Sequence, residues 1–302
     1  MGSTMNFPIR RIPHFHESEY QSPQWFEELI EPDLKWSFEI NSVFHAGTSE
    51  YQNIVLLDTN RFGKVLVIDG KMQSAGKDEF IYHECFVHPV LIFCESPKSV
   101  FIMGGGEGST AREVLKHNGV EKVVKCDIDR VVVDFCRMHL TANQEAFSDG
   151  RLHCIINDAN NEKFDIIIGD LADPLDGGPC NHLYTKSFYE QVIKTKLNDS
   201  GIFVTQAGPA GVLSHKEVFS PIYNTIKQMR SHILLMCPPM QIHVDGFWQL
   251  SINYISVFFY CEFSLDDFFL HNFNYQASDQ QLKLDVEKIE EKIRERVMRD
   301  LQ

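Results

Sequence analysis

The sequence predicts a doubly wound α/β domain with a mostly parallel sheet, preceded by a small antiparallel β domain. Three observations support this fold class. From residue 99 onward, short apolar runs alternate with segments of helical periodicity. Before residue 78, three strand-like runs are separated by turn residues, with no helix between them. A glycine-rich turn at residues 104–108 follows the first apolar run of the alternating part and opens a helix, as in Rossmann-like folds.

The small β domain is expected over residues 24–77. Its runs at 36–45, 50–58 and 64–69 are rich in Val, Ile, Leu and Phe, which is typical of strands. Residues 1–23 are polar and contain three prolines, which favours a loosely held arm. Strand edges in this domain are open to a partner subunit, so we expect a homodimer or homotetramer.

The Rossmann-like domain, of the type found in methyltransferases, is expected over residues 78–302, with Asp78 as a plausible N-cap of its first helix. Expected strands lie at 99–103, 122–127, 153–157, 164–169 and 202–205, and expected helices at 109–117, 130–140, 187–197 and 214–230. The C-terminal region, 236–302, is atypical. Its apolar run 252–261 is too short to span a membrane and indicates a strand, and residues 282–302 predict an amphipathic helix.

Composition excludes several classes of partner. The formal net charge of −14 argues against nucleic acid, because phosphate binding needs a basic surface. An acidic surface would concentrate cationic small molecules, or it could simply keep the protein soluble. The eight cysteines form no C-x-x-C pair, and several lie in apolar runs, so we expect free thiols in the cytosol. We expect neither a signal peptide nor a membrane span.

The glycine-rich turn is the first candidate binding site. Gly104, Gly105 and Gly106 allow positive φ and close approach of a ligand, although glycines can also simply end a strand. Asp127 ends the next strand, where a carboxylate can accept both hydroxyls of a ribose. The turn lacks the G-x-G-x-x-G pattern of NAD sites, and Glu107 would repel a pyrophosphate. Glu107 suits a cationic ligand, such as the sulfonium of an S-adenosyl compound.

Two further acidic segments end predicted parallel strands. Asp158, with the Ala159 amide, could hold an adenine edge, or Asp158 could be a helix cap. Asp170 and Asp173 lie on a loop after the fourth strand, where such a pair can bind an ammonium group and accept its proton. The alternative for this pair is a capping role before Pro174.

A near-match to a zinc motif lies in the first helix of this domain. His83-Glu84 is followed by His88, one residue later than H-E-x-x-H requires, so the two rings leave the common helix face. We therefore expect no metal. The spacing leaves open whether Tyr82 and His83 line a site or cover the sheet.

These segments together resemble the spermidine/spermine synthase family, the aminopropyltransferases, over about residues 24–235. The residues that carry the resemblance are Tyr51 and Gln52, segments 66–73 and 78–82, the glycine turn, segment 126–129, Asn157-Asp158-Ala159 and segment 169–174. Segments 177–180 and 183–190 look like the thermospermine-forming members found in plants. So does His83, where spermidine synthases usually carry Gln.

The resemblance implies a donor, decarboxylated S-adenosylmethionine, which is a co-substrate rather than a cofactor. It implies spermidine as acceptor, giving thermospermine and methylthioadenosine. The implied donor contacts are Gln52, Gly104, Gly105, Gly106, Glu107, Asp127, Ile128, Asp158 and Ala159. Asp170 would accept the proton of the amine, with Gln73, Tyr82, His83, Asp173 and Gln206 around the acceptor. Because a sulfonium is already a good leaving group, such an enzyme mainly aligns the amine with the adjacent carbon.

The chain departs from the family pattern in two places. Only four residues separate Ala159 from Phe164, where the family usually has a longer helical stretch, and residues 244–250 replace an Asp-Thr-Trp-Gly-Trp-like segment. The alternatives that stay open are a spermidine or spermine synthase, an S-adenosylmethionine-dependent methyltransferase, and a non-catalytic polyamine-binding relative.

Overall fold

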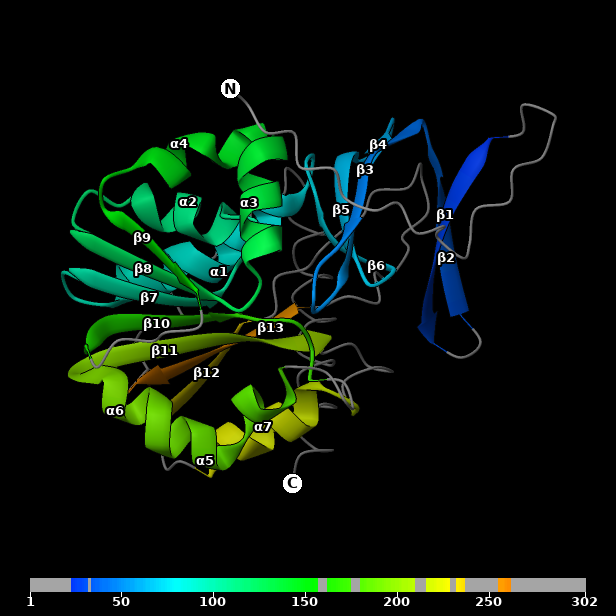
Figure 1. Ribbon diagram of the computed structural model, residues 1–302. Helices are drawn as coiled ribbons and strands as arrows, with labels where there is room; N and C mark the ends of the chain where they lie inside the picture. The colour runs from blue at the N-terminus through cyan, green and yellow to red at the C-terminus, as the bar shows by residue number, and fades with distance from the viewer. Residues whose placement is uncertain are drawn as a thin grey trace, which may run out of the picture. The chain divides into compact units, whose positions relative to one another are not determined.

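The computed structural model describes residues 23–31, 34–156, 162–174, 180–209, 216–228, 232–236 and 255–261 (Figure 1). The expected N-terminal arm up to residue 22, the segment 157–161 and the expected helix at 282–302 lie outside the described residues. The chain divides into two compact units. One comprises Met1–Ile81 and Asp129–Thr141, and the other comprises Tyr82–Ile128 and Ala142–Gln302.

The first unit contains two antiparallel sheets. Strands β1 (Gln24–Glu31) and β2 (Leu34–Ile40) pair with each other. Strands β3 (Ser42–Thr48), β4 (Asn53–Thr59), β5 (Gly63–Ile68) and β6 (Lys71–Ala75) form a four-stranded meander. The prediction of one strand at 36–45 was wrong, because the run changes sheets at Asn41. The Asn41 side chain donates hydrogen bonds to Asp58 and Asn60, which anchors this change of direction.

Helix α3 (Arg130–His139) completes the first unit. Asp129 caps it by accepting hydrogen bonds from the amides of Val131 and Val132. Its apolar stripe packs on the meander through a cluster of buried side chains: Ile54, Leu56, Leu66, Val132, Phe135 and Cys136. The short loop between β8 and α3 therefore carries the chain from one unit to the other.

The second unit is built on a seven-stranded sheet in the order β12-β13-β11-β10-β7-β8-β9. The five parallel strands are β7 (Ser99–Gly104), β8 (Lys122–Asp127), β9 (Leu152–Ile156), β10 (Phe164–Asp170) and β11 (Leu197–Pro209). Strands β13 (Ile255–Cys261) and β12 (His232–Met236) extend the sheet as an antiparallel pair. The predicted mostly parallel sheet is thereby confirmed, and the apolar run 252–261 is a strand.

Helices cover both faces of this sheet (Figure 1). On one face lie α1 (Glu79–Phe93), α2 (Ser109–Leu115), the short η1 (Thr141–Asn143) and α4 (Gln144–Ser148). The other face carries η2 (Asn181–Tyr184), the continuous run of α5 (Lys186–Phe188), the π-helical η3 (Tyr189–Ile193) and α6 (Lys194–Lys196), and then α7 (Phe219–Lys227). The helix predicted at 214–230 is shorter in the structure.

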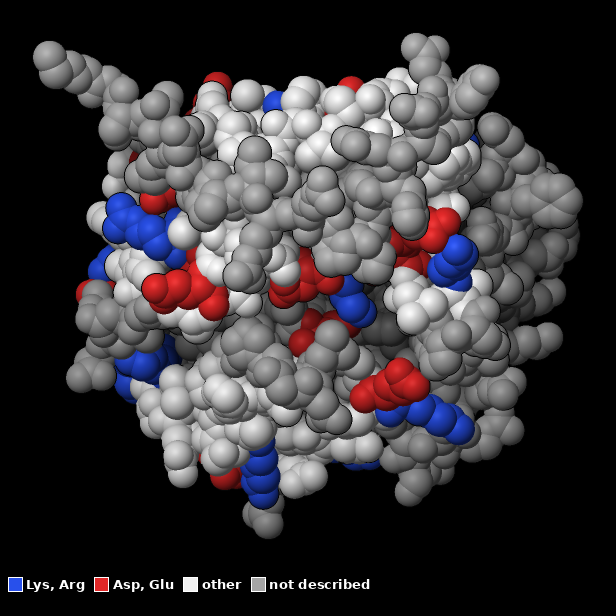
Figure 2. Space-filling model, turned by 45° about the vertical axis from the view of Figure 1, so that its right-hand side comes forward, with Lys and Arg blue, Asp and Glu red and all other residues white. Residues whose placement is uncertain are grey.

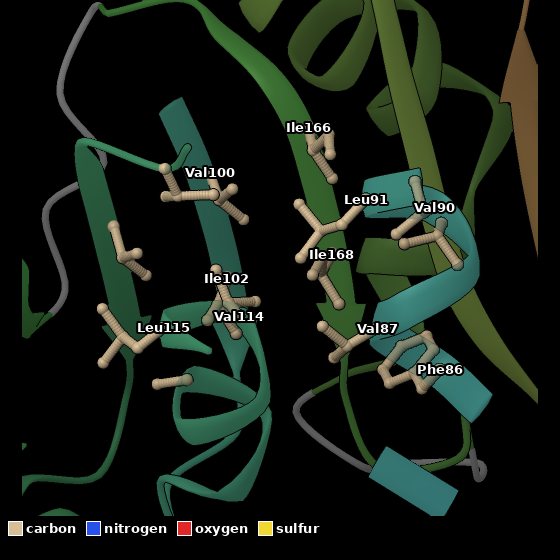
Figure 3. Close-up of a cluster of buried hydrophobic side chains, with 14 of the residues drawn as sticks. Phe86, Val87, Val90, Leu91, Val100, Ile102, Val114, Leu115, Ile166 and Ile168 are labelled. Carbon is tan, nitrogen blue, oxygen red and sulfur yellow. The ribbon is translucent and has the colours of Figure 1, made fainter. Parts of the chain in front are cut away.

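The alternation of side chains along the strands separates two cores. Val100 and Ile102 of β7 point to the core beneath α1 and α2, whereas Phe101 and Met103 point to the core beneath α7. Figure 3 shows the first core, in which Val87 and Leu91 of α1 and Val114 and Leu115 of α2 pack on the strands.

Three smaller findings complete the description. None of the helices in the described ranges is long and apolar enough to cross a membrane. The six described cysteines are free thiols. Among them Cys136 is buried and the others are partly buried, so the expectation of free thiols is confirmed for these six.

Candidate functional site

The order of the parallel strands places the candidate site at the carboxyl ends of β7 and β10. These neighbouring strands lie where the order of strands in the sheet reverses, which is where open α/β sheets bind ligands. Gly104 and Asp170 are directly paired in the register of these strands. The glycine turn and the Asp170 loop, which the sequence placed 66 residues apart, are therefore adjacent at one sheet edge.

The glycine turn is shaped by its contact with Asp170. Gly104 has φ +76° and Gly105 has φ +62°, a left-handed backbone that glycine adopts without strain. A Cβ on Gly104 would collide with the Asp170 carbonyl oxygen, and one on Gly105 would lie 2.9 Å from Asp170 Oδ2. The predicted positive φ is thus confirmed at both residues, but Gly106 does not adopt it. The structure adds a second reason for glycine here, which is the close packing of two strand ends.

Asp170 is held by two neutral hydroxyl groups. Tyr82 Oη donates to Asp170 Oδ1 at 3.1 Å, and Thr110 Oγ1 donates to Oδ2. Burial raises the pKa of Asp170, although the nearby His83 and the Thr110 hydrogen bond act in the opposite direction. Burial, followed by the charge of Asp170, also raises the pKa of Tyr82 well above its ordinary value, so Tyr82 remains a hydrogen-bond donor. The arrangement leaves Asp170 without an ion pair among the described residues and able to take up a proton.

Glu107 pairs with His83 beside Asp170. His83 Nε2 lies 2.8 Å from Glu107 Oε1, and both side chains are largely buried. Glu107 Oε2 is buried and has no hydrogen-bond partner in the described part of the chain. A buried carboxylate oxygen without a partner is costly and fits a site that a cationic group occupies. The spacing had left the place of Tyr82 and His83 open, and the structure puts both against the candidate site.

The other half of the near-zinc motif lies in a separate cluster. His88 Nε2 is 3.2 Å from Glu113 Oε2, so the two histidines contact different glutamates. Glu84, His88 and Glu113 bring possible ligand atoms within 4.8 Å of one another. Lys116 and Arg112 already form ion pairs with Glu113, however, so its charge is balanced by the protein itself.

Asp173, on the loop after Asp170, is hydrogen-bonded to Gln206 of β11. Gln206 Nε2 donates to Asp173 Oδ1 at 3.1 Å and to the Leu171 carbonyl at 2.7 Å. Gln206 is buried, and Asp173 is partly buried. Asp127 ends β8, the strand beside β7, and Ile128 follows it; Ile128 is 43% exposed, which leaves its side chain accessible to a ligand. The structure thus gathers these predicted residues at neighbouring strand ends of one sheet.

The remaining predicted residues lie elsewhere. Gln52 and Gln73 belong to the first unit. Gln52 Nε2 donates to Asp129 Oδ2 at 3.0 Å, and Gln73 is exposed. Asp158 and Ala159 lie outside the described residues, as do Asn157 and most of the connection to Phe164.

Sequence reasoning missed three residues that support the site. Thr110, fully buried, holds Asp170. Asn143 Nδ2 donates to the Glu107 carbonyl at 2.8 Å and to Ser109 Oγ at 2.9 Å. These bonds join the end of the glycine turn to the first residue of α2. Tyr184 Oη accepts a hydrogen bond from Gln206 at 3.1 Å. The hydroxyl residues Ser109 and Thr110, which follow Gly108, were a visible signal for Thr110, whereas no local pattern pointed to Asn143.

Acidic side chains gather near the centre of one face of the molecule, with basic side chains beside them (Figure 2). This distribution agrees with the formal net charge of −14. A negative surface attracts cationic small molecules and disfavours polyanions.

Comparisons with known proteins agree with the geometry. Residues 79–257 match the family described as "Spermine/spermidine synthase domain", and residues 24–75 match the "Spermidine synthase tetramerisation domain". Thermospermine synthase ACAULIS5 of Arabidopsis thaliana is 64% identical over 222 residues, which span 72% of this chain and 66% of that protein. A polyamine aminopropyltransferase of Aeropyrum pernix is 43% identical, over 69% of this chain and 68% of that protein.

Solved structures give the same result. A spermidine synthase crystallised in complex with the transition-state analogue AdoDATO superposes with a TM-score of 0.70 at 29% identity, over 82% of this chain and 84% of that one. The spermidine synthase of Thermotoga maritima has a TM-score of 0.68 at 28% identity, over 82% of this chain and 83% of that one.

Proposed function

This chain belongs to the spermine/spermidine synthase family, whose members are aminopropyltransferases, and we propose that it converts spermidine to thermospermine. The donor is decarboxylated S-adenosylmethionine. The amine nitrogen of spermidine attacks the donor carbon next to the sulfonium, and its lone pair forms the new N–C bond. The C–S bond breaks with its electron pair going to sulfur, which leaves as neutral methylthioadenosine. The proton lost by the amine passes to Asp170.

The environment of Asp170 is the observation that carries this proposal. A base for this reaction must be ionised yet ready to accept a proton, and the raised pKa of the partly buried Asp170 gives it that property. Tyr82 and Thr110 fix both carboxylate oxygens through neutral hydroxyls, and the described residues form no ion pair with Asp170, although the nearby His83 lowers its pKa. Pairing of Asp170 with Gly104 puts this base beside the turn that would hold the donor.

Donor binding is assigned to the glycine turn and its acidic neighbours. The unpartnered Glu107 Oε2 would accept a hydrogen bond from the donor ammonium, and Asp127 would accept the ribose hydroxyls. The backbone of Gly104, Gly105 and Gly106 lets the donor approach. The remaining donor contacts that we propose are Gln52, Ile128, Asp158 and Ala159.

Acceptor binding is assigned to the residues around Asp170 and Asp173. Tyr82 and His83 face the site from α1, and Asp173 supplies a second carboxylate for a polyamine that carries several ammonium groups. Gln73 completes this proposed set from the first unit. The family matches also support a division into a β domain at residues 24–77 and a catalytic domain from residue 78, which we adopt as part of the proposal.

Two observations favour thermospermine as product. The relative with 64% identity is named a thermospermine synthase, whereas the two solved spermidine synthases compared above are 29% and 28% identical. His83, where spermidine synthases usually carry Gln, places its Nε2 2.8 Å from Glu107 Oε1 in the site. A methyltransferase is disfavoured, because the carboxylate of intact S-adenosylmethionine would meet Glu107.

The test is a product assay with matched isomers. The protein is incubated with decarboxylated S-adenosylmethionine and, separately, putrescine or spermidine, and thermospermine is separated from spermine by chromatography. Thermospermine from spermidine is the expected result. Spermine as the main product, or reaction with putrescine alone, would reassign the chain within the family. Absence of any aminopropyl product would contradict the proposal and leave a polyamine-binding role.

We further propose that the protein works as a homo-oligomer. Residues 24–75 match a domain described by its tetramerisation in spermidine synthases. Trp25 and Leu29 of β1 and Leu34 of β2 are largely exposed, and burial of such side chains in a subunit interface is favourable. Sedimentation is expected to show a dimer or tetramer, and a monomer at micromolar concentration would contradict this.

A further inference from the structure

Gln206 is the centre of a hydrogen-bond network that uses all of its polar atoms. Its Nε2 donates to the Leu171 carbonyl at 2.7 Å, to Asp173 Oδ1 at 3.1 Å and to Tyr184 Oη at 3.1 Å. Its Oε1 accepts the Gly208 amide at 2.7 Å. The two N–H groups of the Gln206 amide are thus shared among three acceptor oxygens, and its carbonyl oxygen accepts from the Gly208 amide. The Gln206 side chain therefore has no free N–H with which to bind an acceptor amine.

Tyr184 contributes its hydroxyl group to this network from the core beneath α7. It is buried in the core beneath α7, and its hydroxyl donates to the Ala172 carbonyl at 3.3 Å while accepting from Gln206. Burial, followed by the neighbouring Tyr189 and Asp173, raises the pKa of Tyr184 well above its ordinary value. The hydroxyl therefore keeps its proton and can donate and accept at the same time.

The network ties the loop after β10 to β11. Leu171, Ala172 and Asp173 each receive one hydrogen bond from Tyr184 or Gln206. The loop begins directly after Asp170, the proposed base. These bonds fasten the loop to the neighbouring strand β11 and to Tyr184. Fixing Asp173 Oδ1 leaves Oδ2 of the same carboxylate to be directed at a ligand.

We propose that Tyr184 and Gln206 are positioning residues, which hold the Asp173 carboxylate in the orientation that binds the acceptor amine. This replaces the sequence-based prediction that Gln206 itself binds substrate. The inference rests on the proposed function in one respect, namely that Asp173 contacts the acceptor. A carboxylate free to rotate binds an ammonium less tightly, because ordering it costs side-chain entropy at each binding event. The network therefore affects acceptor affinity more than the chemical step.

The chain offers a closely matched control for Tyr184. Tyr189 is also buried in the same core, and its hydroxyl has no hydrogen-bond partner among the described residues. Tyr184→Phe and Tyr189→Phe each remove one buried hydroxyl from the core, but only the first touches the network. Any general effect of losing a buried hydroxyl appears in both variants.

The kinetic experiment separates acceptor affinity from turnover. In Tyr184→Phe we expect the KM for spermidine to rise about threefold to tenfold, with kcat and the donor KM within about twofold of wild type. In Tyr189→Phe all three constants are expected to stay at wild-type values. Equal spermidine KM in Tyr184→Phe and wild type would overturn the proposal. So would a fall in kcat with an unchanged KM.

Hydrogen exchange tests the network without relying on activity. The Gly208 amide is protected by Gln206 Oε1, so its exchange should become at least threefold faster in Gln206→Leu and in Tyr184→Phe but not in Tyr189→Phe. Unchanged Gly208 exchange in both network variants would overturn the role of the network. If wild type makes no aminopropyl product, the proposed function fails by that result alone, and the exchange data still decide whether Tyr184 and Gln206 hold the loop.

Discussion

Two largely buried glutamates, one within helix α2 and one just before it, differ in the side chains that contact their carboxylates. Glu113, within the helix, has two cationic partners: Arg112 Nε lies 2.9 Å from Oε1, and Lys116 contacts Oε2, which His88 also contacts. Glu107, just before the helix, has only His83, and its second oxygen has no hydrogen-bond partner in the described chain. Nearby Asp170 is bound only by hydroxyl groups. The protein neutralises the first carboxylate itself and leaves the other two for a ligand.

The pKa values follow the same division. Burial alone would raise the pKa of Glu113, but its ion pairs with Lys116 and Arg112 hold the pKa below the ordinary value. Burial raises the pKa of Asp170, and no comparable cation reverses this. We infer that carboxylates with strong protein cations maintain structure here, whereas those with neutral partners serve the chemistry.

The largest expected effect comes from Asp170→Asn. Loss of the base should lower kcat by about a hundredfold to ten-thousandfold. The folded state binds the Asp170 proton more tightly than the unfolded state does, so the contribution of this residue to stability is full at low pH and is lost as pH rises through its raised pKa. At pH 7 the charge is destabilising, and the variant should melt at the same temperature as wild type or higher.

Asp149→Asn is the control for this variant. Asp149 pairs with Arg151, and hydrogen bonds from Arg151 lower the pKa of Asp149. Its replacement should leave kcat unchanged and should not raise the melting temperature. If Asp170→Asn kept more than a tenth of wild-type kcat, the assignment of the base would be wrong.

Exchanging the two glutamates for glutamine tests the comparison directly. Glu107→Gln should raise the donor KM by about tenfold to a hundredfold, because a hydrogen bond to a charged group contributes about 1.5–3 kcal/mol. Its melting temperature should change little. Glu113→Gln should leave both KM values unchanged and lower the free energy of unfolding by about 1–3 kcal/mol, since the buried carboxylate loses its charged hydrogen bonds to Arg112 and Lys116. The two variants should thus separate binding from stability, and a loss of both properties in both variants would refute the division.

A smaller effect is expected on the pH dependence of turnover. The Thr110 hydrogen bond lowers the pKa of Asp170, so Thr110→Val should raise that pKa further. A base must be deprotonated to act, so the acid limb of the kcat profile should move to higher pH in Thr110→Val. Thr110→Ser keeps the hydroxyl and should keep the wild-type profile. An acid limb that does not move would mean that another group limits the rate at low pH.

The fold and the strand ends of the site could be predicted from the sequence, but most of the partners could not. Asp127 and Asp170 were found because acidic residues after apolar runs mark the carboxyl edge of a parallel sheet. Tyr82 and Thr110 were visible as polar residues next to predicted motifs, but they lie 88 and 60 residues from Asp170 along the chain, and no local pattern encodes their hydrogen bonds to it. We propose a different role for Gln206 because hydrogen bonds across the strands occupy its side-chain amide, and the sequence does not show these contacts.

The same limit explains the error in the β domain. Residues 36–45 have the composition of a single strand, and composition does not report which sheet a residue joins. Phe38 pairs with Phe26 of β1, while Val43 pairs with Leu57 of β4. Asn41 lies between them, with its side chain bound to the β4–β5 turn. Tertiary contacts decided the boundary here.

The smallest effect is expected from Lys116→Met, which removes one cation from the Glu113 cluster. Lys116 is 49% exposed, so its ion pair is screened by solvent and should contribute about 0.5 kcal/mol at pH 7. A lowered carboxylate pKa gives stability that is present above the ordinary glutamate range and is lost as pH falls through the folded-state pKa. The free energies of unfolding of wild type and Lys116→Met, measured in urea, should therefore differ at pH 7. The difference should disappear as the pH falls and Glu113 becomes protonated in the folded state. Lys122→Met, which removes an ion pair in which both side chains are exposed, should leave the free energy of unfolding nearly unchanged at pH 7 and at the lower pH. A difference for Lys116→Met that stays constant with pH would mean that Lys116 stabilises the protein through packing rather than through the charge of Glu113.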